Sequence, residues 1–173
     1  MCIDDRREPH SRSVRPWLSS GLLAMVAALA FSLSGSLSHA AHAAEPGAAF
    51  LARMAREPGV TTLPSGLEYK VLKSGDPSGA HPSPGDELVL NYDGTLPDGA
   101  TFDSTDQQGG MARLPFQGLI PGWMQALKLM RPGDEWMLYI PSQLGYGAKG
   151  AGPIPPNSPL VFRIDLVAVH HNG

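Results

Sequence analysis

Three polar side chains in this 173-residue chain could take part in chemistry: Tyr92, Asp103 and Tyr146. Each stands alone, because the sequence contains neither a Gly-x-Ser-x-Gly elbow nor a Gly-x-x-x-x-Gly-Lys-Ser/Thr phosphate loop. Beyond the N-terminal region the histidines are His81, in a predicted turn, and His170 and His171, at the end of the chain. None of them forms a metal-ligand set with nearby residues. We therefore expect no metal, no cofactor and no nucleophilic residue.

A set of large side chains lies at the ends of the predicted β elements. Each of them, taken singly, is typical of a core residue. Together, and with Asp103 next to Phe102, they predict an apolar cup with few polar groups, which is how small-ligand pockets are usually built. The set consists of Tyr92, Phe102, Leu119, Ile120, Trp123, Tyr146, Ile154 and Phe162.

Residues 145–156 form the most unusual segment, with four glycines and three prolines in twelve positions. This composition permits backbone conformations that few other sequences adopt. Tyr146 and Ile154 are its large apolar side chains. Ordered loops of this kind often position a functional group, so we expect the segment to overhang the apolar cup. A simple connection between two strands is the alternative.

The elements that must position these residues follow from hydrophobic periodicity. Residues 118–131 carry apolar side chains at helical spacing, with Pro121 in the first turn and Pro132-Gly133 as the end. The turn at residues 96–99 predicts a hairpin. The fold class is α+β, an antiparallel sheet of about five strands with one helix across it. Strands are predicted near residues 67–71, 88–92, 101–103, 135–140 and 160–169.

The N-terminal region has the three parts of a secretory signal peptide: a basic start, an apolar stretch at residues 22–31 and small residues ending in Ala44. We expect residues 1–43 to be a signal peptide cleaved after Ala43, which implies a periplasmic protein. Residues 17–37 are also about long enough to span a bilayer, so a retained membrane anchor is the alternative. Residues 44–63 are expected to form a short helix and linker, and residues 64–173 the single folded domain.

Charge and cysteine content exclude several classes of function. The net charge is −3 and no run of Lys or Arg follows the leader, so nucleic-acid binding has no support. The only cysteine, Cys2, lies in the leader. The remaining chain can form neither a disulfide nor a thiolate site.

Four motifs, in order along the chain, resemble the FKBP-type peptidyl-prolyl cis-trans isomerases. They are Tyr92-Asp-Gly-Thr-Leu-Pro-Asp-Gly-Ala-Thr-Phe-Asp-Ser104, Leu119-Ile-Pro-Gly-Trp123, Tyr139-Ile-Pro-Ser-Gln-Leu-Gly-Tyr-Gly147 and Ile154-Pro-Pro-Asn-Ser-Pro-Leu-Val-Phe162. A fifth segment, Pro64-Ser-Gly-Leu-Glu-Tyr-Lys70, is similar to the envelope branch of that family in Gram-negative bacteria. The resemblance covers residues 59–169.

The resemblance implies a half-barrel sheet wrapped on a short helix that includes residues 125–129. The substrate proline would lie on the Trp123 indole, and Asp103 would order the polar side of the pocket. The Tyr146 hydroxyl and the Ile120 N–H would donate hydrogen bonds to peptide carbonyls. The implied catalytic residues are Asp103, Tyr146, Trp123 and Phe102, and the implied substrate-binding residues are Tyr92, Leu119, Ile120, Ile154 and Phe162.

The resemblance also implies isomerisation of Xaa-Pro bonds during the folding of exported proteins, by desolvation and without a covalent intermediate. Proline-containing polypeptides would be the partners, and the chain would act as a monomer. A peptide-binding periplasmic chaperone with incidental isomerase activity is the alternative.

The sequence departs from the family at Gln108, where an arginine commonly pairs with the aspartate, and near Ala112, where a pocket-wall aromatic is common. We therefore expect a more open pocket, and binding of macrolides such as tacrolimus or rapamycin is a weaker expectation than activity.

Overall fold

The computed structural model describes residues 47–171; the predicted leader lies outside this range. Its sheet has seven strands in the order β1-β2-β6-β7-β3-β4, with β5 paired to β3, and all the pairs are antiparallel. The elements are α1 (Gly47–Met54), β1 (Val60–Thr62), β2 (Glu68–Lys73), β3 (Glu87–Thr95), β4 (Thr101–Ser104), β5 (Ala112–Pro115), α2 (Pro121–Leu127), β6 (Glu135–Ile140), a 3-10 turn (Ser142–Leu144) and β7 (Leu160–His170).

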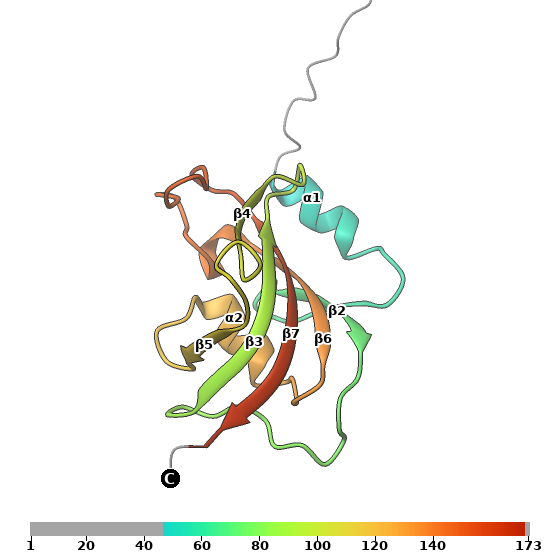
Figure 1. Cartoon of the computed structure of the whole chain (residues 1–173). Helices are drawn as coiled ribbons and strands as arrows, with labels where there is room; N and C mark the ends of the chain where they lie inside the picture. Colours follow the sequence, from blue (N-terminus) through green and yellow to red (C-terminus); the bar gives the residue numbers. More distant parts are fainter. Residues whose placement is uncertain (1–46, 172–173) are drawn as a thin grey trace, which may run out of the picture. The chain divides into compact units, whose positions relative to one another are not determined.

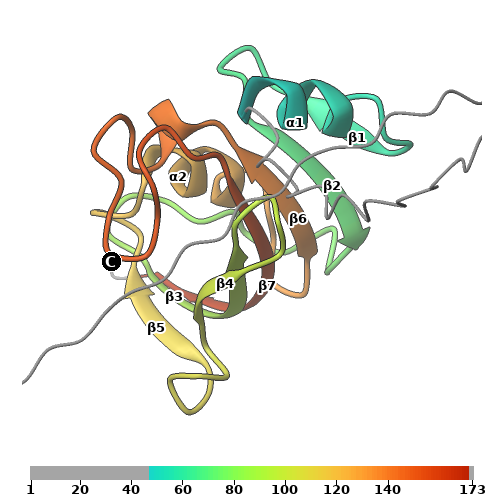
Figure 2. The same ribbon diagram turned by 90° about the horizontal axis from the view of Figure 1, so that it is seen from above.

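The sheet curves around α2, so the helix lies on its concave side and α1 lies outside, next to β2 (Figures 1 and 2). This arrangement confirms the α+β half-barrel that the sequence predicts. The two additional strands, β1 and β5, have only three and four residues. β1 is largely exposed and β5 half-buries only Ala112 and Leu114, so neither is long enough to give a clear alternation of apolar and polar residues. Among residues 47–171, no helix is both long enough and apolar enough to cross a bilayer.

Helix α2 is shorter than the predicted span of residues 118–131. Pro121 occupies its first turn, where the missing N–H costs nothing, and the helix ends before Lys128. Trp123, Ala126 and Leu127 are buried against the sheet, as the helical spacing predicts. Met130 is fully buried although it lies beyond the helix, because the following turn folds back over the core.

The long central strands β3 and β7 carry the residues of the concave face. Leu90 and Tyr92 of β3 and Phe162 and Ile164 of β7 are buried in one hydrophobic cluster with α2. Their neighbours Asp93 and Arg163 are exposed on the other face. The alternation arises because successive side chains of a strand point to opposite faces of the sheet. Each fully buried side chain of this type stabilises the fold by about 1.5–3 kcal/mol.

The short N-terminal helix α1 packs its apolar side on the convex face of the sheet. Phe50 and Met54 are buried, and the Phe50 ring lies edge-on to Tyr139 of β6 with 6.1 Å between centroids. The short helix expected within residues 44–63 is therefore present, and it docks on its own domain. Glu68 is the cross-strand neighbour of Tyr139, is 4% exposed, and has a buried Oε2 without a hydrogen-bond partner among the described residues.

Burial raises the pKa of Glu68 above its ordinary value. A carboxyl group with a higher pKa in the folded state stabilises the fold below its unfolded pKa, and this contribution is lost as pH rises through the folded pKa. Glu68→Gln is therefore expected to raise the free energy of unfolding by about 1 kcal/mol at pH 8. The gain should disappear near pH 4. Thermal unfolding across this pH range measures the effect.

Glu57→Gln is the matched control, because Glu57 is exposed and loses the same charge. It should change stability by less than about 0.5 kcal/mol at either pH. An equal response of the two variants at pH 8, or a gain at Glu68 that persists at pH 4, would contradict this account of the buried carboxyl group.

Candidate functional site

Two aromatic rings contact the Trp123 indole, and a third ring contacts one of these two. Tyr92 meets the indole edge-on, with 5.2 Å between centroids and 79° between planes. Phe162 meets it at 5.1 Å and 84°, and Phe102 meets Phe162 at 5.4 Å and 88°. These edge-to-face contacts place positive ring edges on negative ring faces and favour fixed ring orientations. The structure thus brings together four aromatic residues that lie up to seventy positions apart in sequence.

The indole itself is only 5% exposed, so it is less accessible than the open pocket expected from the sequence requires. Tyr92 and Phe162 both pack against the indole and also contact each other, with 6.2 Å between their centroids, which contributes to this burial. The indole Nε1 is buried and has no hydrogen-bond partner among the described residues. Trp123 therefore contributes both to the core and to the floor of the site.

The remaining apolar candidates belong to the same hydrophobic core or pack against it. Leu119 and Ile120 are half-buried and pack against the same hydrophobic cluster, as does Ala112 of β5. Ile154 is 6% exposed and belongs to the cluster itself. Tyr146 differs from the others because it is 41% exposed, so its hydroxyl is accessible to a partner molecule.

The glycine- and proline-rich segment of residues 145–156 folds back on itself rather than simply crossing between strands. The backbone groups of Ala151 and Ile154 exchange hydrogen bonds of 3.0 and 2.8 Å. The N–H of Asn157 donates to the carbonyl of Gly147 at 2.9 Å, which closes the base of the segment. Gly147, Gly150 and Gly152 have positive φ angles, which glycine adopts without strain. These contacts insert Ile154 into the core and leave Tyr146 at the surface.

A group of polar side chains lies beside the aromatic rings. The Tyr92 hydroxyl donates to Asp103 Oδ2 at 2.7 Å. Gln108 Nε2 donates to Asp103 Oδ1 at 2.7 Å and to the Tyr92 hydroxyl at 2.9 Å. Gln108 therefore donates to Asp103 from the position where the sequence analysis noted the missing arginine. The sequence marked this position as a departure, but it could not predict these contacts.

Burial, followed by the hydrogen bond to Asp103, raises the pKa of Tyr92 to about 12. The phenol consequently keeps its proton throughout the physiological range and remains a donor to the carboxylate. Among residues 47–171, no three His, Cys, Asp or Glu side chains are placed to hold a metal ion. The arrangement can bind an apolar group against the rings and orient a neighbouring polar chain.

Gly94 is a residue of the site that the sequence analysis did not identify. It lies on β3, two positions after Tyr92 and on the same face, between the rings of Phe102 and Phe162. A Cβ at this position would lie 2.7 Å from Phe162 Cε1 and 2.8 Å from Phe102 Cε2. Residues two positions apart on a strand point to the same face of the sheet, so the expected inward position of Tyr92 could have revealed Gly94 as well.

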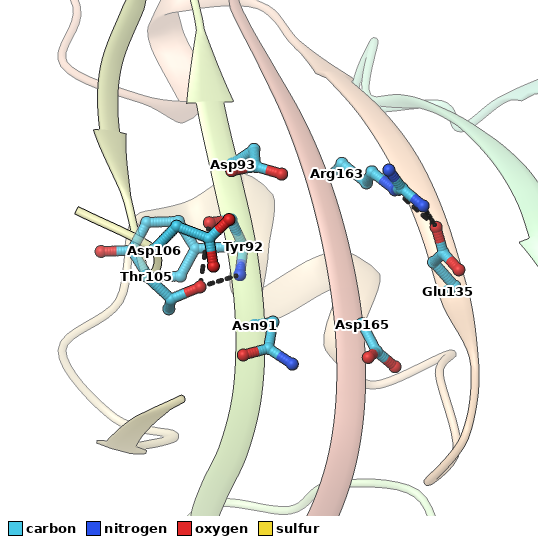
Figure 3. Close-up of a pocket in the computed structure, with 8 residues that line it drawn as sticks. All are labelled: Asn91, Tyr92, Asp93, Thr105, Asp106, Glu135, Arg163 and Asp165. Atoms are coloured by element: carbon cyan, nitrogen blue, oxygen red, sulfur yellow. Dashed lines mark hydrogen bonds and ion pairs between the residues drawn. The ribbon is translucent and has the colours of Figure 1, made fainter. Parts of the chain in front are cut away.

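A separate cavity of about 220 Å³ opens on the convex face of the sheet (Figure 3). Its lining is polar, and the Arg163–Glu135 ion pair of 2.5 Å lies at one side. Tyr92 contributes its backbone there, where Thr105 Oγ1 accepts from the Tyr92 N–H at 3.2 Å. This lining suits water and charged groups rather than a proline ring, so the group of aromatic rings around Trp123 remains the better candidate site. The lining residues are Asn91, Tyr92, Asp93, Thr105, Asp106, Glu135, Arg163 and Asp165.

Comparisons with known proteins agree with this geometry. Residues 78–167 match the family described as FKBP-type peptidyl-prolyl cis-trans isomerase, and residues 27–71 match the domain amino terminal to it. The chain is 45% identical over 127 residues to the peptidyl-prolyl cis-trans isomerase Mip of Coxiella burnetii, covering 73% of this chain and 54% of that protein. It is 44% identical to the outer membrane protein MIP of Legionella longbeachae, covering 71% and 52%. The chain thus spans about half the length of these curated relatives.

Solved structures show the same similarity in three dimensions. The crystal structure of FkpA from Escherichia coli superposes with a TM-score of 0.69 at 40% identity, covering 72% of this chain and 57% of that one. A peptidyl-prolyl cis-trans isomerase from Pseudomonas syringae pv. tomato superposes with a TM-score of 0.67 at 37% identity, covering 72% and 91%. The family match covers about half of this chain, and this chain covers 91% of the Pseudomonas syringae structure at 37% identity. We conclude that this chain belongs to the FKBP-type peptidyl-prolyl cis-trans isomerases.

Proposed function

We propose that this protein is a peptidyl-prolyl cis-trans isomerase that accelerates the interconversion of Xaa-Pro bonds. The observation that carries the proposal is the Trp123 indole enclosed edge-on by Tyr92 and Phe162, in a chain of this family. A proline ring is apolar and flat enough to contact such a surface. The polar group at Asp103 lies at its side and would orient the peptide on one face.

The chemistry of isomerisation suits a site without a nucleophile. Rotation about the Xaa-Pro bond breaks no covalent bond, but it must overcome a barrier of about 18–20 kcal/mol. At the twisted transition state the nitrogen loses conjugation with the carbonyl, and the amide becomes less dipolar. A water-poor aromatic surface disfavours the planar, dipolar form more than the twisted one, so the barrier falls.

The size of each free-energy contribution indicates which residues lower the isomerisation barrier most. A ten-thousand-fold acceleration requires about 5–6 kcal/mol. One neutral hydrogen bond from the exposed Tyr146 hydroxyl contributes only about 0.5–1.5 kcal/mol, and the Ile120 N–H contributes a similar amount. Desolvation against Trp123 and Phe102 therefore supplies most of the lowering. In this proposal Leu119, Ile154 and Phe162 hold the proline in place.

We propose further that the protein acts as a monomer on exported polypeptides in the periplasm. Residues 1–43 have the pattern of a cleaved signal peptide, and a relative of the chain is named an outer membrane protein. Helix α1 has eight residues and packs Phe50 and Met54 on its own sheet, which leaves little apolar surface for a second copy. Recovery of a periplasmic protein that begins at Ala44 tests the leader; a chain still carrying residues 1–43 in the membrane fraction would contradict it.

Proline-limited refolding of an unfolded protein and exchange NMR on an Ala-Leu-Pro-Phe peptide test the proposed activity. We expect acceleration at micromolar protein, and loss of at least about fivefold in kcat/KM for Asp103→Ala, which removes the acceptor of the polar group. Peptide binding without acceleration would reject the isomerase proposal in favour of a peptide-binding chaperone. Tacrolimus inhibition in the same assay tests macrolide binding.

The loop of residues 145–156 provides a matched pair of variants. Gly150→Ala would place a Cβ against the Ile154 carbonyl oxygen, whereas nothing lies within 4 Å of a Cβ at Gly147. Both glycines have positive φ, 66° and 60°, so the backbone strain of the two substitutions is comparable. We expect Gly150→Ala to lower kcat/KM about fivefold by displacing Tyr146 and Ile154. Gly147→Ala should lower it less than twofold, and equal effects would show that the loop does not position the site.

A further inference from the structure

The Gln108 side chain completes a closed ring of hydrogen bonds at the edge of the aromatic hollow. Its Nε2 donates to Asp103 Oδ1 and to the Tyr92 hydroxyl, while the Tyr92 hydroxyl donates to Asp103 Oδ2. Both carboxylate oxygens and both amide hydrogens therefore have partners within the ring. Such mutually satisfied polar groups fix one another's orientation more strongly than a single pair does.

A short turn between β4 and β5 carries Gln108 to this position. The N–H of Gln108 donates to the Thr105 carbonyl at 3.1 Å, and the N–H of Gly110 donates to the same oxygen at 2.9 Å. Thr105 is buried, and its N–H and Oγ1 both bond the backbone of Tyr92. The turn is thus anchored directly to the residue that Gln108 contacts through its side chain, so its position relative to the Tyr92 ring is defined.

In the described part of the chain, no ion pair joins a cation to the Asp103 carboxylate. The ion pairs within residues 47–171 join other residues, such as Arg113 with Glu87. Its hydrogen-bond partners are one phenol and one amide, both neutral. The orientation of Asp103 and Tyr92 therefore depends on donor geometry and not on charge.

We propose that Gln108 is a positioning residue for the isomerase site. It holds the Asp103 carboxylate and, through the shared hydroxyl, the Tyr92 ring that meets Trp123 edge-on. This inference rests on the proposed function. An amide does not titrate, so the donor at residue 108 does not change with pH. The support requires a donor at this position rather than a positive charge.

Gln108→Glu tests the requirement for a donor, because the new side chain has nearly the same shape. Above its pKa the introduced carboxylate has no proton to donate and repels Asp103. Below its pKa the carboxyl group regains one O–H donor. We expect kcat/KM to fall about tenfold at pH 8 and to recover to within about threefold of wild type near pH 5. Wild type itself should show no such dependence on pH.

Gln107→Glu is the matched control, since this exposed neighbour undergoes the same change of charge. Its backbone N–H donates to Ser104 Oγ at 3.2 Å, and its side chain has no hydrogen bond within residues 47–171. It should leave kcat/KM unchanged at both pH values. Gln108→Ala removes the donor altogether, and we expect a loss of about fivefold that is independent of pH. The thermal midpoint of each full-length variant is measured alongside, so that unfolding is not mistaken for lost positioning.

The possible outcomes separate this inference from the function on which it rests. An active wild type with a pH-dependent loss only in Gln108→Glu supports it. An active wild type in which Gln108→Glu behaves like Gln107→Glu, or loses activity equally at pH 5 and pH 8, overturns the positioning role and leaves the isomerase proposal intact. An inactive wild type overturns both.

Discussion

Replacing Trp123 by alanine is expected to lower kcat/KM at least about tenfold and to reduce the free energy of unfolding by about 3–5 kcal/mol. Both losses follow because the indole is part of the hydrophobic core and also part of the proposed site. It is almost fully buried and packs against Tyr92 and Phe162, and in the proposed function it is the surface on which a proline would lie. Chemical denaturation and the peptide exchange assay measure the two effects.

Trp123→Phe separates the two contributions, because a smaller aromatic ring keeps part of the packing. We expect this variant to remain folded and to lose less stability than Trp123→Ala, while kcat/KM still falls several-fold because the floor is smaller. A folded variant with the turnover of wild type would show that the site lies elsewhere on the molecule.

Gly94→Ala is expected to produce the second large effect. One methyl group would lie within 2.8 Å of the Phe102 and Phe162 rings, so at least one wall of the hollow must move. Overpacking of this kind typically costs about 1–3 kcal/mol of stability. The edge-to-face contact of 5.4 Å between the two rings should be lost, and kcat/KM should fall about tenfold.

Gly99→Ala is the control for this substitution, because Gly99 lies in the β3–β4 hairpin and nothing lies within 4 Å of a Cβ there. Its φ of 87° makes alanine costly for stability, but the pocket should be untouched. The activity per folded molecule should therefore fall in Gly94→Ala and not in Gly99→Ala. The opposite ranking would contradict the assignment of these two rings to the pocket.

Periodicity and turn chemistry predicted the elements that bury a continuous apolar face. The alternation of Leu88, Leu90 and Tyr92 predicted the central strand β3, and Glu135–Ile140 was predicted with the boundaries that the structure has. The short strands β1 and β5 were missed, because they are too short to give a clear alternation and pairing with longer neighbours stabilises them. The predicted helix was longer than α2 because the apolar Met130 was assigned to it. In the structure the buried Met130 lies in the turn that follows the helix.

The aromatic residues of the site could be predicted because their types and motifs are distinctive, but their contacts could not. Burial of Trp123 depends on how Tyr92 and Phe162 from different strands approach it. The contacts of Gln108 depend on a turn whose course the sequence does not specify, and the same is true of Gly94 between two rings. Long-range side-chain geometry of this kind is set by the whole sheet, whereas sequence patterns report mainly on local structure.

The central claim is that proline isomerises against the Trp123 indole in a water-poor aromatic hollow. NMR of the protein with an Ala-Leu-Pro-Phe peptide tests it most directly, through exchange between the cis and trans forms and proton contacts between the two molecules. The account predicts accelerated exchange together with contacts from the proline ring protons to the indole of Trp123 and the ring of Phe102. Accelerated exchange with the proline contacting other residues, such as those of the polar cavity around Asn91 and Asp165, would contradict it.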